Sequence, residues 1–257
     1  MLANYHTHTK RCQHATGEDR EYVEAAIEAG LKILGFADHC PWIYPDKDFV
    51  SGIRMAPNQV DDYFYSLESL KKEYVKDIKI YIGLETEHCP DMIPDQDKLL
   101  EGYPLDYMLC GQHFLGAETP DFYAGRARND ETFLKKYVDI AIDGINSDRY
   151  LYLAHPDLIN FTGEDEIYRK HMKRLCEALK AKNIPVEINV LGLWTNRHYP
   201  SKRFFELAKE TGNTAIIGTD AHAPKHLVNK EAVRKAELFC EEFDLPIIDD
   251  DLLKDDK

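Results

Sequence analysis

The chain has 257 residues, of which 44% are hydrophobic and 30% are charged, and its formal net charge is −14. These values are typical of a globular protein with enough apolar material for a large core. The negative charge disfavours a general grip on extended nucleic acid, because clustered Lys and Arg hold phosphate backbones. A small phosphorylated substrate is still compatible with it, since bound divalent cations would reverse the sign of a pocket locally.

The expected location of the chain is the cytoplasm. No apolar run approaches the roughly 20 residues that a membrane helix needs, so we expect no membrane partner. The N-terminal stretch MLANYHTHT lacks the basic start and apolar core of a signal peptide. Reduced thiols are therefore expected at all six cysteines, which form no CxxC pair. The acidic residues Asp249–Asp251 and Asp255–Asp256 predict a solvated end.

Apolar segments alternate with helical patterns along the chain. The segments predicted as strands are short, rich in Ile, Val, Leu and Tyr, and show little polar alternation, as parallel strands buried on both faces do. Helices are predicted where apolar residues recur at helical spacing, with an Asn cap at Asn58 and a stop at Gly30. In chain order, the elements expected are strand Leu2–His6, helix Glu18–Gly30, strand Ile33–Asp38, helix Asn58–Val75, strands Ile78–Glu85 and Tyr107–Gln112, helix Asp130–Ile145, strand Tyr150–His155, helix Glu164–Lys182, strand Val186–Val190, helix Ser201–Thr211, strand Thr214–Thr219 and helix Asn229–Phe243.

Imidazole and carboxylate side chains recur at or just beyond the ends of these strands. They are the ligands that zinc, manganese and iron accept. Because residues i and i+2 of an extended segment point to the same side, two pairs with this spacing can each reach one ion, and a carboxylate can bridge two cations. The nine candidates are His6, His8, His14, His39, Glu85, His113, His155, Asp220 and His222.

The alternation of strands and helices predicts an α/β fold, either a barrel or an open doubly wound sheet. In a flat sheet the strand ends that carry ligands would spread over about 25–30 Å, at about 4.8 Å per strand. A barrel gathers them at one mouth. We therefore predict a seven-stranded, TIM-like (β/α)7 barrel with a multinuclear metal site at its C-terminal mouth. No repeat or linker divides the sequence, so one domain over residues 1–257 is expected.

Six of these strand ends carry motifs that resemble a known family. The motifs YHTHT, GFADH, GLETE, GQH, LAHPD and GTDAH are similar to those of the polymerase and histidinol phosphatase (PHP) superfamily. The stretches CQHATG and EINVLGL resemble its histidinol-phosphatase branch, and the resemblance covers about residues 2 to 245. It implies a distorted seven-stranded barrel with two or three divalent metal ions, zinc, manganese or iron, at the C-terminal mouth.

The resemblance also implies how the ligands are shared. The first ion would be held by His6, His8, Glu85 and Asp220, the second by Glu85, His113 and His155, and the third by His14, His39 and His222. The catalytic centre would then include Glu85 as the bridge, with Asp220 and His222 near the leaving group, where the general acid is left unassigned.

A phosphate monoester also needs a cationic grip, and the resemblance places Arg197 in the phosphate site. Its planar fork suits two phosphate oxygens. A second arginine of the family is absent, because the residues after LAHPD read Leu158–Phe161. Arg54, Arg126 and Arg128 are alternative cations, although an arginine in such a loop is more often a solvated surface residue. The aromatic residues Trp42, Tyr44 and Trp194 predict either a pocket wall or simple loop packing.

The leading functional hypothesis is a metal-dependent phosphomonoesterase, of histidinol-phosphatase type, that hydrolyses L-histidinol phosphate in histidine biosynthesis. A general PHP phosphoesterase acting on nucleotides or oligonucleotide ends is the alternative, and the missing arginine favours it. A catalytically idle metal-binding or polymerase-accessory module is disfavoured, because the ligand set is complete. The outer helices of a barrel can be solvated or paired, so a homo-oligomer stays open.

Overall fold

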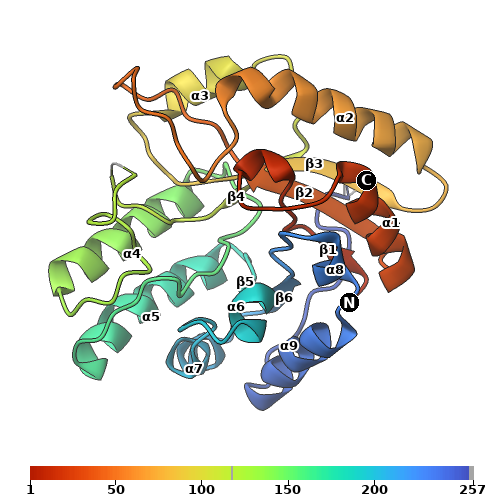
Figure 1. Cartoon of the computed structure of the whole chain (residues 1–257). Helices are drawn as coiled ribbons and strands as arrows, with labels where there is room; N and C mark the ends of the chain where they lie inside the picture. The colour runs from red at the N-terminus through yellow and green to blue at the C-terminus, as the bar shows by residue number, and fades with distance from the viewer. Residues whose placement is uncertain (117, 255–257) are drawn as a thin grey trace. The chain divides into compact units, whose positions relative to one another are not determined.

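The computed structural model describes residues 1–116 and 118–254, which divide into two compact units (Figure 1). The first unit comprises Met1–Met108, Thr219–Glu231 and the end of the chain from Asp249. The second comprises Leu109–Gly218 and Ala232–Ile248. Among the described residues, no helix is long and apolar enough to cross a membrane. The expectation of one domain over residues 1–257 stays a prediction.

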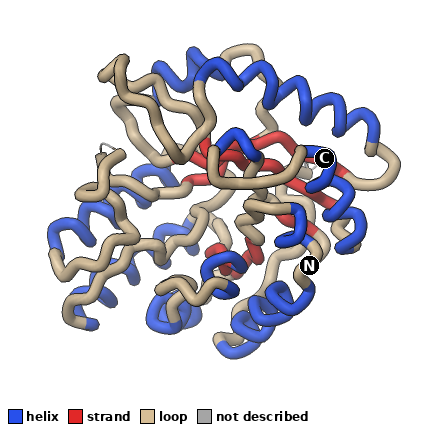
Figure 2. The backbone as a smooth tube through the Cα atoms, viewed as in Figure 1, coloured by secondary structure: helices blue, strands red, loops and turns tan. Residues whose placement is uncertain are grey.

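The first unit is built on parallel strands (Figure 2). They are β1 (Ala3–Asn4), β2 (Ile33–His39) and β3 (Lys79–Thr86), in the order β1-β2-β3-β4, and β4 (Tyr107–Cys110) begins in this unit. Every residue of β2 is buried, as its apolar sequence predicts. The register between β2 and β3 places His39 opposite Glu85. Two candidate ligands from distant parts of the sequence therefore lie side by side.

Helices of the first unit flank this sheet. They are α1 (Asp19–Ala29), α2 (Val60–Glu73), α3 (Ile93–Leu100) and α8 (Pro224–Leu227), with 3-10 turns η1 (Lys10–Cys12) and η2 (Pro57–Gln59). The predicted stop at Gly30 is confirmed, because this residue ends α1 with a φ of 86°. The predicted cap at Asn58 is wrong. Pro57 sets a helical φ one residue earlier, so the chain enters through η2 and Gln59 precedes α2.

The second unit contains two paired parallel strands and its own helices. The strands are β5 (Val186–Asn189) and β6 (Ala215–Gly218). The helices are α4 (Glu131–Asn146), α5 (Asp165–Ala181), α6 (Val190–Trp194), α7 (Lys202–Thr211) and most of α9 (Lys230–Glu242). Helices α4 and α5 lie side by side (Figure 1), joined by an ion pair of Arg174 with Asp139 at 2.7 Å. The structure describes all six cysteines and has no disulfide among them.

The predicted strand Tyr150–His155 is not formed, so the described residues contain six strands. Leu153 alone makes bridges, to Cys110 and to Val186. The ladder stops because the Glu187 side chain accepts the His155 N–H at 2.6 Å, and because His155 has a φ of 31°. Such a positive φ is incompatible with extended backbone. The α/β class with parallel strands is confirmed, whereas a count of seven strands is not.

The acidic end of the chain is only partly solvated, because Asp250 is exposed as predicted whereas Asp249 and Asp251 are half-buried. Asp249 accepts hydrogen bonds from the backbone N–H groups of Leu2 at 2.6 Å and Ala3 at 2.9 Å. Asp251 accepts one from the Tyr81 hydroxyl at 2.8 Å. Asp249 thus satisfies backbone donors at the start of β1 and Asp251 a side-chain hydroxyl, which a charge pattern alone does not reveal. Asp255 and Asp256 lie outside the described residues.

We expect Asp249→Ala to lower the free energy of unfolding by roughly 1–2 kcal/mol, because two backbone donors lose a charged acceptor. Urea unfolding followed by circular dichroism measures the change. Glu28→Ala, at an exposed position of α1, is the matched control and should stay within about 0.5 kcal/mol of the parent. Equal stability of the two variants would show that the acidic end does not stabilise β1.

Candidate metal centre

Two segments of the first unit that are remote in sequence pair beyond the end of β1. Thr7 bridges to Ala221, and the His8 N–H donates to the Ala221 carbonyl at 2.9 Å. The Ala221 N–H donates in turn to the His6 carbonyl at 3.2 Å. This pairing aligns the pair His6 and His8 with the pair Asp220 and His222. The i, i+2 geometry predicted from the sequence is therefore realised on both segments.

The first group of ligand atoms has the spacing of a metal site. His8 Nε2 lies 3.0 Å from Asp220 Oδ1, and His6 Nε2 lies 3.6 Å from the same oxygen. His6 Nε2 is also 3.6 Å from Glu85 Oε1. Ligands about 2.0–2.1 Å from a tetrahedral zinc ion are separated from one another by about 3.3 Å. The donor set and its spacing therefore fit a divalent cation.

The Glu85 carboxylate lies between two groups of histidines. Its Oε1 faces His6, whereas its Oε2 is 3.6 Å from His8 Nε2 and 3.1 Å from His39 Nδ1. The side chain is fully buried. Its position follows from the register of β3 against β2, which sets Glu85 opposite His39. The two oxygens thus face different imidazoles, and the predicted bridge from this site to the ion of His113 and His155 stays a prediction.

A second group of histidines has nitrogen lone pairs directed at each other. His14 Nδ1 lies 2.7 Å from the Cys12 carbonyl and His222 Nδ1 lies 2.9 Å from the Asp220 carbonyl. A carbonyl only accepts, so both Nδ1 atoms carry the proton and both Nε2 atoms present a lone pair. The two Nε2 atoms are 3.0 Å apart. A cation between them would relieve this repulsion, and His39 offers a third nitrogen within 4.8 Å of both.

The charges of the first group depend on one another. Burial lowers the pKa of His8, but hydrogen bonds to Asp220 and Asp38 outweigh it and raise the pKa to about 9. Burial, with the charge of His8, lowers the pKa of His222 to about 3. Although burial opposes it, the charges of His6 and His222 help to hold the pKa of Asp220 well below its usual value. A cation bound here would take the place of the His8 proton.

Asp38 belongs to the site but was not among the predicted residues. It is fully buried, and its Oδ1 lies 3.5 Å from His8 Nδ1 and accepts the His39 N–H at 2.8 Å. The Thr9 hydroxyl donates to its other oxygen. A carboxylate on the far nitrogen of a ligand histidine fixes the tautomer and the ring orientation. The GFADH motif could have indicated Asp38, because this carboxylate immediately precedes the predicted ligand His39 at the end of β2.

Arg54, interpreted from the sequence as a solvated residue or a phosphate-binding cation, is not solvated, and its role toward phosphate stays a prediction. Its guanidinium is buried and donates to both oxygens of Glu87, at 3.1 and 3.2 Å, and to the Cys40 carbonyl at 3.2 Å. Trp42 Nε1 donates to the same carboxylate at 3.1 Å. These contacts hold the loop after β2 against β3. The loop encloses a pocket of about 320 Å³ whose lining includes Trp42 and Tyr44, so these aromatic residues do form a pocket wall.

The second unit holds the remaining candidates. The rings of His113 and His155 have centroids 4.9 Å apart. Arg197 is exposed and its Nη1 donates to the Tyr199 hydroxyl at 2.6 Å, while the Tyr199 ring lies 5.7 Å from that of His155. Arg197 is thus linked to a predicted ligand through one tyrosine. The alternative cation Arg126 pairs with Asp121 at 3.0 Å on the surface, and Arg128 stacks over the Phe133 ring at 3.7 Å.

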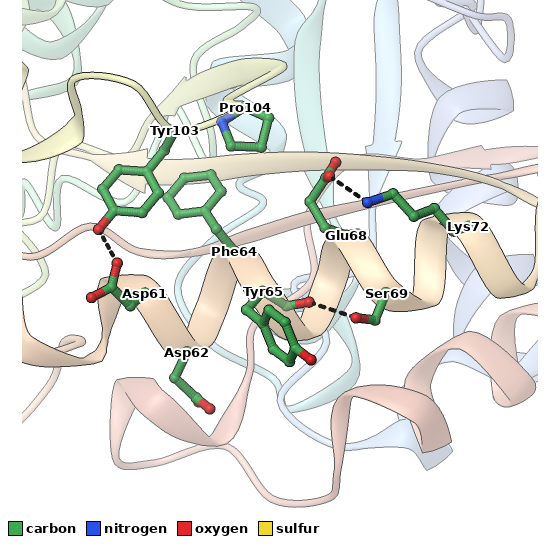
Figure 3. Close-up of a pocket in the computed structure, with 9 residues that line it drawn as sticks. All are labelled: Asp61, Asp62, Phe64, Tyr65, Glu68, Ser69, Lys72, Tyr103 and Pro104. Carbon is green, nitrogen blue, oxygen red and sulfur yellow. Dashed lines mark hydrogen bonds and ion pairs between the residues drawn. The ribbon is translucent and has the colours of Figure 1, made fainter.

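A larger pocket of the first unit lies along α2, away from the predicted ligands (Figure 3). Its volume is about 560 Å³, and none of the nine candidates lines it. Two pairs of its polar side chains contact each other: Tyr103 donates a hydrogen bond to Asp61, and Lys72 pairs with Glu68 at 3.2 Å. Its lining has three carboxylates, Asp61, Asp62 and Glu68, beside the single cation Lys72 and contains no predicted ligand, so this groove is not the candidate metal centre.

Comparison with known proteins agrees with the chemistry of the cluster. The model of the PHP domain family matches residues 4–190. A probable histidinol-phosphatase of Deinococcus radiodurans is 28% identical, with 87% of each chain covered. The crystal structure of histidinol phosphate phosphatase from Lactococcus lactis, complexed with zinc, L-histidinol and phosphate, superimposes with a TM-score of 0.73 at 20% identity, over 100% of this chain and 99% of that one. A putative histidinol phosphatase from Listeria monocytogenes gives a TM-score of 0.71 at 21% identity, over 90% and 99%.

We expect Glu85→Gln to weaken zinc binding at least ~100-fold. Loss of an outer partner of a ligand already costs about 10- to 100-fold, and here the ligand itself loses its charge. Competition between the apoprotein and a chromophoric chelator measures the affinity. Asp19→Asn is the matched control, because Asp19 is also a buried carboxylate but pairs with Arg11 at 2.9 Å. The control should lose stability and keep its zinc. Undiminished zinc affinity in Glu85→Gln would contradict the bridging role.

Proposed function

Because the chain belongs to the PHP domain family, we propose that it is a metal-dependent phosphomonoesterase that hydrolyses L-histidinol phosphate to L-histidinol and phosphate. The observation that carries this proposal is the buried Glu85 carboxylate, whose Oε1 faces His6 and whose Oε2 faces His8 and His39. The names of the relatives from Deinococcus radiodurans and Lactococcus lactis support the substrate. A place in histidine biosynthesis in the cytoplasm follows from that substrate.

The proposed centre holds two or three divalent ions, and the nine predicted ligands are assigned to it. His6, His8, Asp220 and Glu85 would hold one ion, and His14, His39 and His222 another. Glu85, His113 and His155 are proposed to hold the remaining ion, with Glu85 as the bridge, in a barrel whose seventh strand is the Tyr150–His155 segment. Zinc in the Lactococcus lactis structure supports that metal, and the histidine and carboxylate donors accept manganese and iron as well.

In the proposed reaction the residues of the chain position the phosphate and the charges around it. Divalent cations held by these histidines and carboxylates would lower the pKa of a water and neutralise charge on the phosphate. Glu85 holds the spacing between its two groups of histidines, and Asp38 holds the orientation of His8. Arg197, an arginine next to Tyr199, would bind two phosphate oxygens with its fork. The residue that protonates the leaving oxygen stays unassigned.

A nucleotide or an oligonucleotide end is the alternative substrate. The residues that replace the second arginine of the family include Leu158, Ile159 and Phe161, all buried, so they offer no cation to a phosphate. If Arg197 alone bound the phosphate, the position of the missing arginine could accommodate the alcohol part of a different substrate, such as a nucleoside. The net charge of −14 still disfavours an extended nucleic acid.

The proposed activity is tested by phosphate release from L-histidinol phosphate beside nucleotides and sugar phosphates, with zinc-loaded protein. We expect kcat/KM for L-histidinol phosphate of at least ~10⁴ M⁻¹s⁻¹, as dedicated enzymes show, and far above the other substrates. Glu85→Gln prepared in parallel controls for contaminating phosphatases. A higher kcat/KM for a nucleotide would move the chain to the general phosphoesterase branch, and no turnover of any ester would refute the proposal.

Arg197→Ala should raise KM for L-histidinol phosphate ~10-fold or more and leave the zinc content unchanged. A lost hydrogen bond to a charged group costs about 1.5–3 kcal/mol, and Arg197 is assigned to the substrate. Steady-state kinetics and metal analysis of one preparation give both values. Arg126→Ala, at another exposed arginine of the second unit, should match the parent. If Arg197→Ala lost zinc, its assignment to the phosphate would be wrong.

A further inference from the structure

A buried carboxylate of the second unit, Glu187 in β5, is neither a predicted ligand nor a group that the proposed reaction uses. Its side chain is fully buried. One oxygen, Oε2, accepts the backbone N–H of His155 at 2.6 Å, and Oε1 accepts the Tyr152 hydroxyl at 3.4 Å. Burying a carboxylate costs free energy that such hydrogen bonds must offset. Glu187 therefore has to be explained by what it holds in place.

The backbone that Glu187 holds is strained. His155 has a φ of 31°, a conformation that residues other than glycine rarely adopt. Such a residue persists only where its surroundings fix it, and the short bond from its N–H to a carboxylate does so. Neighbouring β6 is shaped to admit this carboxylate. A Cβ atom at Gly218 would lie 1.9 Å from Glu187 Oε1, so only glycine leaves room for it.

The same carboxylate also reaches the segment that carries Arg197. Glu187 Oε2 accepts a hydrogen bond from Asn189 Nδ2 at 3.2 Å. The Asn189 side-chain oxygen accepts the Gly192 N–H at 2.8 Å and so caps α6. The Gly192 carbonyl in turn accepts the Arg197 N–H at 2.9 Å. A single oxygen thus joins the backbone of His155 to the helix that leads to Arg197.

We propose that Glu187 is a positioning residue, whose carboxylate fixes the strained backbone of the metal ligand His155 and, through Asn189, the α6 segment that carries Arg197. This inference rests on the proposed function, in which His155 binds a metal ion. In this proposal the positioning depends on the length of the Glu187 side chain. The length of Glu187 matters because the acceptor must arrive within 2.6 Å of the His155 nitrogen. The charge matters less, because a carbonyl oxygen can accept the same two hydrogen bonds.

Two substitutions separate reach from charge. Glu187→Gln keeps the length and one acceptor oxygen, whereas Glu187→Asp keeps the charge and is one methylene shorter. Zinc titration of each apoprotein against a chelator gives the number and affinity of bound ions, with His155→Ala as the reference for loss of this ligand. Asn213→Ala, which removes another buried polar side chain of the second unit that donates to a backbone carbonyl, controls for lost stability. Thermal unfolding is followed on the same samples.

We expect Glu187→Asp to lower the affinity for one zinc ion 10- to 100-fold, and this should be the same ion whose affinity His155→Ala lowers. The zinc affinity of Glu187→Gln should stay within about threefold of the parent. Asn213→Ala should unfold at a lower temperature and keep its zinc. Asn189→Asp is the second variant should Glu187→Asp fail to fold: it keeps the α6 cap, repels the Glu187 carboxylate and should weaken the same ion.

Three results would overturn the inference. The first is parental zinc affinity in Glu187→Asp, or in Asn189→Asp where that variant replaces it. The others are a loss of zinc affinity in Glu187→Gln equal to that in Glu187→Asp, and parental zinc binding in His155→Ala. Turnover of L-histidinol phosphate by the parent protein is measured independently. The proposed activity can therefore stand when the role of Glu187 fails.

Discussion

The parallel register that sets His39 opposite Glu85 is the constraint on which the rest of the site depends. A one-residue slip of β3 would turn Glu85 to the other face of the sheet, because side chains alternate along a strand. Because β2 is buried on both faces, close packing sets this register, and a Cβ atom at Gly83 of β3 would lie 2.4 Å from the Tyr107 ring. Once Glu85 Oε2 is fixed beside His39, the segment of Thr7, which pairs with Ala221, places His6 at Oε1 and His8 at Oε2, and both histidines also contact Asp220.

Such a gathering of carboxylates and imidazoles is unfavourable without a cation. Glu85 is fully buried and Asp220 nearly so, and burying a carboxylate costs several kcal/mol that its partners must offset. A proton on His8 offsets part of this cost, but the facing Nε2 atoms of His14 and His222 cannot satisfy each other while both are neutral. Divalent cations would both neutralise the buried carboxylates and accept the facing Nε2 lone pairs. The surrounding residues, Asp38 above all, serve to orient the donors, so the geometry is prepared before a metal arrives.

Much of the first unit's site could be predicted from the sequence, because its signals are local. The i, i+2 pairs at His6 and Asp220 and the carboxylate that ends β3 follow from strand geometry. The residues that support the ligands were less visible. The roles of Asp38 and Glu187 depend on which strand lies next to theirs, and that information is not local. The same limitation explains the acidic end, where Asp249 is bound by the backbone of β1, 246 residues away at Ala3. The lost strand at Tyr150–His155 has a similar origin, since a side chain of β5 takes the hydrogen bond that would have extended it.

Crystallographic location of zinc by anomalous scattering tests most directly whether this cluster is a metal centre. Diffraction from zinc-loaded crystals on both sides of the zinc absorption edge would show each ion without reference to activity. The predicted result is a peak about 2.0–2.2 Å from donor atoms of His6, His8 and Asp220, with a Glu85 oxygen shared between that ion and a second one. An ordered cluster without anomalous density, or zinc bound only at surface residues, would contradict it.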